Sequence, residues 1–362
     1  MKKILAVCCL FFLSFEVKAA EEDSLRLLYE QVSQNYVEPI TVEKLALLVL
    51  KSFRQVDKSL TVADDNNKVS LYYKGRLIKS LYKPQDMNNV EAWTKLSGEI
   101  FDLVLAKSKE AQNRDFEILD LVMQKAVEGL DKDSKYYLSL EDAKSLKHRV
   151  HFVARREGDI LLIKIGAFNN FTKEEIVKAI NENQDAKGMI LDLRASPGGQ
   201  LSTAIEVADL FLDEGIVISA KGRKTDEITY YNSEDGDIWE NKPIVVMVDG
   251  DSASAAEVLT IALQEQSRAK VVGTKTFGKG TIQNLLVLKN GGTLAYSSAY
   301  FHTPSGKKLA DNAIVPDVCT YQMPEGKDVL RLINAPKDEE CGQENRQDGT
   351  LEYEIAVELL KI

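Results

Sequence analysis

Short, almost wholly apolar runs alternate with helical patterns along the chain from about residue 152, and few architectures accommodate that order. Ile160–Ile165, Met189–Leu193 and Ile244–Val248 have the composition of strands buried on both faces of a sheet. Helical spacing follows in Lys173–Asn183 and Leu201–Leu212. The alternation predicts an α/β domain in which helices cover a buried sheet.

The remainder of this region continues the same alternation. We expect, in order, a helix over Ala255–Gln266, strands over 271–272, 282–288 and 293–300, and a last helix over Leu351–Leu360. Asn290-Gly291-Gly292 joins the last two strands, which therefore resemble an antiparallel addition to the sheet.

Residues 22–148 are predicted to be mainly helical. Apolar residues recur at three- and four-residue spacing in Ser24–Tyr36, Val42–Phe53, Val90–Lys109 and Phe116–Leu130. Between them, Lys68–Tyr82 alternates as a small hairpin would, with Lys74-Gly75 at its turn. We therefore expect a helical N-terminal region with a hairpin insertion (21–150), an α/β core (151–325) and a C-terminal segment that ends in a helix (326–362).

Residues 1–20 have the three parts of a secretory signal peptide. Lys2 and Lys3 are followed by the apolar run Ile4–Phe15, and the segment ends in the small residues Ala19-Ala20. The apolar run is too short for a stable membrane span, although a retained anchor is the alternative. We expect cleavage after residue 20, export to the periplasm or beyond, and no membrane span in the mature chain.

Composition restricts the partners of the chain. With 28% charged and 44% hydrophobic residues, the sequence is that of a folded protein rather than a disordered one. Its formal net charge is -10, and nucleic acids and anionic membrane surfaces carry the same sign. Nucleic acid is therefore not expected as a partner.

The cysteines indicate a disulfide rather than a metal site. Cys8 and Cys9 would leave with the signal peptide, so Cys319 and Cys341 would remain. In an oxidising compartment this pair is a candidate disulfide, and two unrelated thiols are the alternative. The chain has only three histidines and no Cys/His cluster, so no metal site is expected.

The first segment that could carry chemistry is Asp249–Glu257, which follows the apolar run Ile244–Val248 and opens a helix rich in alanine. Ser254 at such a helix start either caps the helix or acts as a nucleophile beside helix N–H groups that stabilise an oxyanion. Small neighbouring side chains leave room for a substrate, which favours the nucleophile.

The second segment, Gly273–Thr281, nearly matches a phosphate-binding loop. Gly280 replaces the required Ser or Thr, and a strand rather than a helix follows, so a nucleotide site is disfavoured. Lys279, flanked by glycines, is instead a candidate general base. To act near neutral pH its pKa must fall from about 10.4 by roughly 3 units, about 4 kcal/mol, which burial can supply.

The third segment, Leu191–Gln200, ends a strand in Pro197-Gly198-Gly199. These glycines either provide the backbone freedom of a turn or offer the N–H of Gly198 or Gly199 to an oxyanion.

The histidines are poor candidates for a base that activates Ser254. His148 and His151 precede the α/β region, and His302 has no motif around it. Lys279 needs no histidine partner, and a Ser–Lys dyad is a known variant of the catalytic triad.

Together these segments resemble the C-terminal processing peptidases, also called tail-specific proteases, of serine peptidase family S41. The matching segments, in the family's order, are Leu191–Leu201, Ser252–Glu257, Gly273–Gln283, Phe301–Gly306 and Val315–Asp317. The resemblance extends over Ile160–Val318 and is weaker at Tyr36–Pro39 and Leu130–Ser134.

The resemblance implies a role for each matching residue. Ser254 matches the nucleophile, Lys279 the general base, and Gln283 the residue that orients this lysine. The N–H groups of Ala255 and of the Gly198-Gly199 turn match the oxyanion hole. The implied fold is an α/β core similar to the crotonase and Clp-type peptidases, with a cap of helices and strands.

One departure from the family concerns substrate recognition. Family members usually carry a PDZ domain before the catalytic core, but here the core begins by about Phe152, shortly after Tyr136-Tyr137. A PDZ domain captures the C-termini of substrates, so the sequence leaves open how C-termini are recognised and whether an adaptor replaces this domain.

We therefore expect an exported serine endopeptidase that cleaves proteins or peptides with a Ser–Lys dyad and needs no cofactor. Whether it cuts near C-termini stays open. The alternative is a non-catalytic adaptor that binds peptides or proteins on a peptidase fold, although a binding protein needs neither Ser254 nor Lys279.

Overall fold

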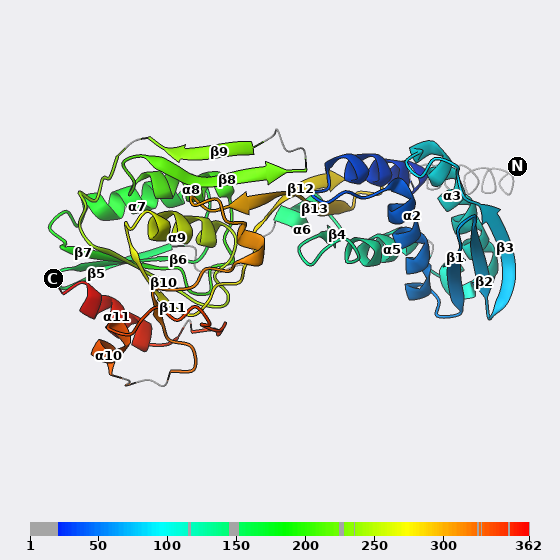
Figure 1. Ribbon diagram of the computed structural model, residues 1–362. Helices are drawn as coiled ribbons and strands as arrows, with labels where there is room; N and C mark the ends of the chain where they lie inside the picture. The colour runs from blue at the N-terminus through cyan, green and yellow to red at the C-terminus, as the bar shows by residue number, and fades with distance from the viewer. Residues whose placement is uncertain are drawn as a thin grey trace, which may run out of the picture. The chain divides into compact units, whose positions relative to one another are not determined.

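The computed structural model describes residues 21–361 apart from 115–116, 145–151, 224–227, 235, 324–325, 327 and 347, so the predicted signal peptide lies outside the described residues. The chain divides into two compact units (Figure 1). Unit 1 comprises Met1–Ser145 and Gln283–Ala299, and unit 2 comprises Leu146–Ile282 and Tyr300–Ile362. Residues 283–299 thus belong with the N-terminal region, whereas the sequence predicts them in the α/β core.

Helices make up most of unit 1, as the apolar spacing predicts. They are a helix over residues 21–35, α2 (Val42–Lys51), the 3₁₀ helix η1 (Ser52–Gln55), α3 (Val90–Lys107), α4 (Lys109–Gln112), α5 (Ile118–Val127) and α6 (Leu140–Lys144). Trp93 and Ile100 are fully buried between them, and the Phe53 and Phe101 rings pack edge to face with centroids 5.3 Å apart.

The predicted hairpin is part of a three-stranded antiparallel sheet. β2 (Lys68–Tyr73) and β3 (Arg76–Tyr82) form the hairpin, and β1 (Leu60–Asp64) pairs with β2. Lys74 and Gly75 have positive φ of 51° and 73°, as a two-residue hairpin turn requires.

A short pairing explains why residues 283–299 join unit 1. β4 (Lys135–Tyr137) runs antiparallel to the first residues of β13 (Thr293–His302). The carbonyl of Ser297 also accepts a hydrogen bond from the backbone N–H of Val37 (2.8 Å).

A six-stranded sheet forms the centre of unit 2, in the order β14-β11-β10-β7-β6-β5. Its strands are β5 (Phe152–Glu157), β6 (Ile160–Ile165), β7 (Gly188–Asp192), β10 (Ile244–Val248), β11 (Lys270–Gly273) and β14 (Val318–Cys319). All neighbours are parallel except β5, which runs antiparallel to β6.

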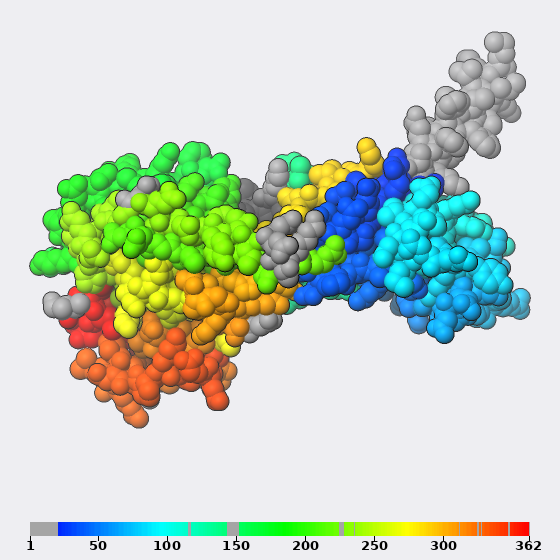
Figure 2. Space-filling model, turned by 45° about the horizontal axis from the view of Figure 1, so that its top comes forward, coloured from blue at the N-terminus to red at the C-terminus, as the bar shows by residue number. Residues whose placement is uncertain are grey.

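Helices cover both faces of this sheet, which is why its strands are apolar throughout. Leu191 and Val246 face the helices α7 (Thr172–Asn181), α8 (Leu201–Asp209) and α9 (Ala255–Glu265). Val245 and Met247 face α11 (Leu351–Leu359), beside the short helix α10 (Val329–Ile333). Figure 2 shows the orange and red C-terminal residues packed against the yellow and green residues of the same unit.

The other strands form a second sheet in the order β12-β13-β8-β9, with β8 (Gly215–Gly222), β9 (Ile228–Ser233) and β12 (Thr281–Val287). The chain passes between the units within β12 and β13. A 3₁₀ helix, η2 (Leu309–Asp311), follows β13. Within the described ranges, no helix combines the length and the apolar character needed to cross a membrane.

Candidate active site

Three loops of unit 2 begin at the carboxyl ends of neighbouring parallel strands. β7, β10 and β11 end in line, because Met247 is paired with Asp192 and Val248 with Gly273. The loops that follow hold the three segments predicted to carry chemistry. The carboxyl edge of a parallel sheet is where α/β proteins build their sites.

Ser254 occupies the position before the first residue of α9. Its backbone has φ 56° and ψ -118°, a conformation that side-chain-bearing residues seldom adopt. Such strain costs about 1–3 kcal/mol and persists where the surroundings fix the backbone, which is common at functional sites. The residue as a whole is partly buried.

Glu257, in the first turn of α9, is buried at the centre of the site. Its Oε2 atom accepts hydrogen bonds from the backbone N–H groups of Ser254 and Lys279, both at 2.9 Å. Its Oε1 atom accepts from the Thr276 hydroxyl (2.6 Å) and the Gly278 N–H (2.7 Å). Burial raises the pKa of the Glu257 carboxyl, although these four donors act in the opposite direction.

This shared carboxylate brings the two predicted reacting residues together. The backbone N–H groups of Ser254 and Lys279 donate to the same oxygen atom, so the two nitrogens are no farther apart than twice 2.9 Å. A further bond, from the Phe277 N–H to the Ser252 carbonyl (3.0 Å), joins the same two loops. The structure therefore places Ser254 and Lys279 at one site, although they belong to different loops.

Gly198 lies directly against Ser254. A Cβ atom at this position would be 2.6 Å from the Ala253 carbonyl oxygen, 2.7 Å from the Ala255 nitrogen and 2.9 Å from the Ser254 Cβ. The glycine also has a positive φ of 92°. Only glycine allows this loop to approach the helix start so closely.

The adjacent glycine contacts a different neighbour. Gly199 has φ 147°, and a Cβ atom there would overlap the backbone of Phe168. Among the described residues, the backbone N–H groups of Gly198, Gly199 and Ala255 have no hydrogen-bond acceptor. These are the three groups predicted to bind an oxyanion.

Asp249 connects the loop after β7 with the loop after β10. Its carboxylate accepts from the backbone N–H of Ala195 (2.9 Å) and from the Ser252 hydroxyl (3.2 Å). The Ala253 N–H donates to the Ser196 carbonyl (2.9 Å). Burial raises the pKa of the Asp249 carboxyl. This network fixes the loop of Gly198 against the loop of Ser254.

Arg194, in the loop after β7, is buried among acidic groups. It pairs with Asp192 (2.9 Å) and Glu352 (3.4 Å). It also donates to the carbonyls of Arg346 and Gly349. The loop after β7 is therefore anchored to the C-terminal helix α11.

Gln283 is the residue predicted to orient Lys279. It belongs to unit 1, where its side-chain amide donates to the Asp133 carbonyl. Its role in orienting Lys279 therefore stays a prediction. The two cysteines singled out by the sequence, Cys319 and Cys341, are joined by a disulfide bond with Cα atoms 6.0 Å apart.

The sequence alone did not reveal the roles of Glu257, Asp249 and Arg194. A signal for Glu257 was present, since an acidic residue three positions after a helix-capping serine is a common helix start. Asp249 and Arg194 each follow an apolar strand, where a charged residue needs a buried partner. In the portion of the chain that the structure describes, no three His, Cys, Asp or Glu side chains are grouped to hold a metal ion.

Comparison with known proteins finds a family match over the region that contains the three loops. Residues 159–320, which contain all three loops, match Peptidase family S41. Over these residues the chain is similar to the peptidases of that family. It is 37% identical over 206 residues to a carboxy-terminal-processing protease of Bartonella bacilliformis, an alignment that covers 54% of this chain and 46% of that protein.

Two further relatives of the S41 domain are similar over different lengths. A probable CtpA-like serine protease of Staphylococcus aureus is 30% identical over 278 residues, 76% of this chain and 53% of that protein. The solved photosystem II D1 C-terminal processing protease is 29% identical, with a TM-score of 0.42, over 50% of this chain and 48% of that one. The chain spans about half the length of the curated relatives it matches.

Proposed function

We propose that this chain is an exported serine peptidase in which Ser254 is the nucleophile and Lys279 the general base. The observation that carries the proposal is the single carboxylate oxygen of Glu257 that binds the backbone N–H of both residues. A protein that only binds peptides does not need a serine and a lysine whose backbones are held together by one carboxylate.

The chemistry follows from this arrangement. The neutral amine of Lys279 takes the proton of the Ser254 hydroxyl, and the alkoxide attacks a peptide carbonyl. Lys279 then gives the proton to the leaving amine, which departs with the C-terminal part of the substrate. A water molecule, deprotonated by the same lysine, hydrolyses the acyl-enzyme and restores both residues.

The negative charge of the tetrahedral intermediate is stabilised by backbone N–H groups. Ala255 offers the first N–H of α9, where the helix dipole is positive, and Gly198 and Gly199 offer theirs from the facing loop. Their lack of acceptors among the residues described, and the contact of Gly198 with Ser254 and Ala255, support this role.

The substrates are proposed to be proteins or peptides outside the cytoplasm. The names of the relatives point to processing at carboxyl termini, and we extend that class to this chain. Export is supported by the residue pattern at 1–20 and by the Cys319–Cys341 disulfide, since disulfides persist in oxidising compartments. Because residues 138–151 are too few for a PDZ domain, an adaptor would present the substrate C-termini.

Labelling with a fluorophosphonate, which reacts with activated serines, tests the two roles. The protein should be labelled, Ser254→Ala should not be, and labelling of Lys279→Ala should slow by about 100-fold or more. Ser202→Ala, which removes an exposed serine of α8, is the matched control and should label normally. Labelling that persists in both Ser254→Ala and Lys279→Ala would refute the assignment.

The substrate class can be tested with the same variants. The protein and Ser254→Ala are incubated with an envelope protein extract, and the new chain termini are compared by mass spectrometry. Termini that form only with the active serine identify the cleaved bonds. Equal sets of termini would instead support a non-catalytic binding protein.

A further inference from the structure

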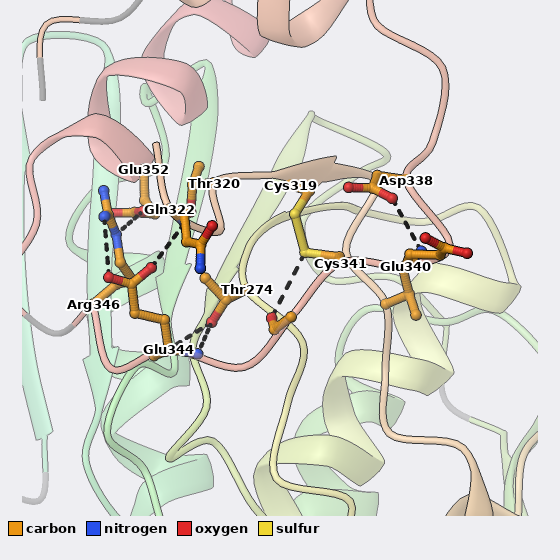
Figure 3. The surroundings of a disulfide bond; sticks show 12 residues. Thr274, Cys319, Thr320, Gln322, Asp338, Glu340, Cys341, Glu344, Arg346 and Glu352 are labelled. Atoms are coloured by element: carbon orange, nitrogen blue, oxygen red, sulfur yellow. Dashed lines mark hydrogen bonds and ion pairs between the residues drawn. A yellow bond between two sulfur atoms is a disulfide. The ribbon is translucent and has the colours of Figure 1, made fainter. Parts of the chain in front are cut away.

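A C-terminal segment, Cys341–Arg346, runs along the side of two loops of the site. Figure 3 shows Glu344 of this segment beside Thr274, at the start of the loop after β11, and Arg346 beside Glu352. The segment has no helix or strand of its own. It nevertheless makes a continuous series of hydrogen bonds to the loops that carry Ser254 and Lys279.

The loop that leads to Lys279 is bound at three successive residues. The Thr274 hydroxyl donates to the Glu344 carbonyl (2.8 Å), and the Lys275 N–H donates to the Gly342 carbonyl (2.9 Å). The side-chain amide of Gln343 donates to the carbonyl of Thr276. Thr276 is also the residue whose hydroxyl binds Glu257, so the segment and Glu257 hold this loop from two sides.

The loop that leads to Ser254 is bound by the same segment. The Glu344 carbonyl that receives the Thr274 hydroxyl also accepts from the Gly250 N–H (2.8 Å). The Arg346 N–H donates to the Asp249 carboxylate (3.2 Å), and the Asn345 amide donates to Asp251. One short segment therefore sets the spacing of the two loops.

Both ends of the segment are fixed. At its start, Cys341 is bonded to Cys319, which is paired with Gly273 at the last position of β11. At its end, Arg346 forms an ion pair with the fully buried Glu352 (2.9 Å). The disulfide thus attaches the segment to the strand from which the Lys279 loop begins.

We propose that Cys341–Arg346 is a positioning element for the Ser–Lys site and that peptidase turnover depends on the intact Cys319–Cys341 disulfide. This inference rests on the proposed function. A dithiol reductant transfers two electrons and two protons to the bond, the S–S bond breaks into two thiols, and the dithiol becomes a cyclic disulfide. The start of the segment is then free to leave the loops, and the relative position of Ser254 and Lys279 is no longer fixed.

The experiment compares the oxidised protein with the same protein reduced by dithiothreitol, in a Cys8→Ser, Cys9→Ser background so that only one pair can react. Amide hydrogen exchange at Gly250 and Lys275 reports whether their hydrogen bonds to the segment are formed. Steady-state hydrolysis of a peptide measures turnover. Reduction should speed exchange at both amides and lower kcat by at least about tenfold, with KM changed far less, because small displacements of reacting groups cost up to about 100-fold in rate.

Two controls separate positioning from general damage. The Ala253 N–H, which bonds to Ser196 and not to the segment, should keep its exchange rate, and reoxidation should restore kcat. A Cys319→Ser, Cys341→Ser variant should show the reduced kcat at once and no response to dithiothreitol. Gln343→Ala, with its disulfide intact, should lower kcat several-fold without changing the redox response.

The possible outcomes are distinct. Unchanged exchange, or faster exchange with unchanged kcat, overturns the proposal. Faster exchange at all three amides also overturns it, because the disulfide would then stabilise the whole unit. If even the oxidised protein cleaves no peptide and is not labelled by a fluorophosphonate, the proposed function fails. The dependence of turnover on the disulfide fails with it, and the exchange data still decide whether the segment holds the loops.

Discussion

Single side chains hold the site through partners that are distant in the sequence. The side chain of Glu257 is fully buried. None of the four groups that donate hydrogen bonds to its carboxylate is charged. A buried carboxylate is costly unless every lone pair is used, and here three backbone N–H groups and one hydroxyl use them. The residue is therefore a positioning group for Ser254 and Lys279.

Glu257→Gln should lower both turnover and stability. A glutamine presents an N–H₂ group where an oxygen now accepts two donors, so at least one buried N–H loses its acceptor, at a cost of about 1–3 kcal/mol. The displaced loops should reduce kcat by about 10- to 100-fold. Peptide hydrolysis and thermal unfolding measure the two effects.

Val258→Ala is the matched control for that variant. It removes buried apolar contacts at the next position of α9 and leaves all four donors of Glu257 in place. It should reduce stability with kcat nearly unchanged. If Glu257→Gln behaves in the same way, Glu257 is only a structural residue.

Gly198→Ala should abolish activity in a folded protein. The added methyl group would lie within 3 Å of Ser254 and Ala255, at a backbone φ that L-residues resist, so the loop must move away from Ser254. We expect labelling by a fluorophosphonate to fall by about 100-fold or more.

Gly158→Ala separates the contact from the backbone effect. Gly158 also has a positive φ, 60°, but no atom lies within 4 Å of its added Cβ. This variant should lose about 1 kcal/mol of stability, like Gly198→Ala, and keep its labelling rate. A normal labelling rate in Gly198→Ala would show that the loop is not part of the site.

At the scale of elements, the strands that the sequence predicted are those with a strong pattern. β6, β7 and β10 are apolar on both faces and were placed within a residue of their observed bounds. β1 was missed because its burial alternates over only five residues and its last residue is an exposed aspartate. A strand so short is recognisable only from its partner, β2.

Asp64, at the end of β1, should stabilise unit 1 in a pH-dependent way. It pairs with Lys51 of α2 (2.7 Å) and Lys83 (3.3 Å), and the hydrogen bond from Lys51 holds the pKa of Asp64 below 3.8. The carboxyl is more acidic in the folded chain, so its contribution is present above 3.8 and lost as the pH falls through the lowered pKa.

Asp64→Asn should therefore reduce stability by about 0.5–1 kcal/mol at pH 7, a value limited by solvent screening, and the deficit should vanish below its lowered pKa. Trp93 lies in unit 1 and the only other tryptophan, Trp239, in unit 2, so denaturant unfolding in a Trp239→Phe background reports unit 1. Glu99→Gln, which breaks an exposed pair with Lys79, should change little at either pH. A deficit independent of pH would rule out the ion pairs as its source.

At the scale of the whole molecule, the sequence predicted which loops meet but not what fixes them. The order of strands and the rule that sites form at carboxyl edges were enough to bring Ser254, Lys279 and Gly198 together. Glu344 lies far along the chain in a stretch without apolar periodicity or motif, and the pattern that predicts a helix over Leu351–Leu360 does not show what Glu352 contacts. Contacts of this kind depend on tertiary packing, so no local pattern records them.

The last helix of the chain should determine the stability of unit 2 through one buried charge. Glu352 of α11 accepts from Thr320 (2.6 Å) and pairs with Arg346 (2.9 Å) and Arg194 (3.4 Å). Removing one partner of a buried ionic cluster leaves the others uncompensated, which costs about 3–5 kcal/mol. Because Arg194 lies in the loop that ends at Gly198, Glu352→Gln should weaken the fold and the site together.

Denaturant unfolding of Glu352→Gln in a Trp93→Phe background, where Trp239 reports unit 2, should show this loss, and peptide hydrolysis should show a lower kcat. Glu354→Gln changes an exposed residue two positions along the same helix and should stay within about 0.5 kcal/mol of the unsubstituted protein. Equal stability of the two variants would mean that the apolar contacts of Leu351 and Ile355, rather than the buried charges, hold α11 to the sheet.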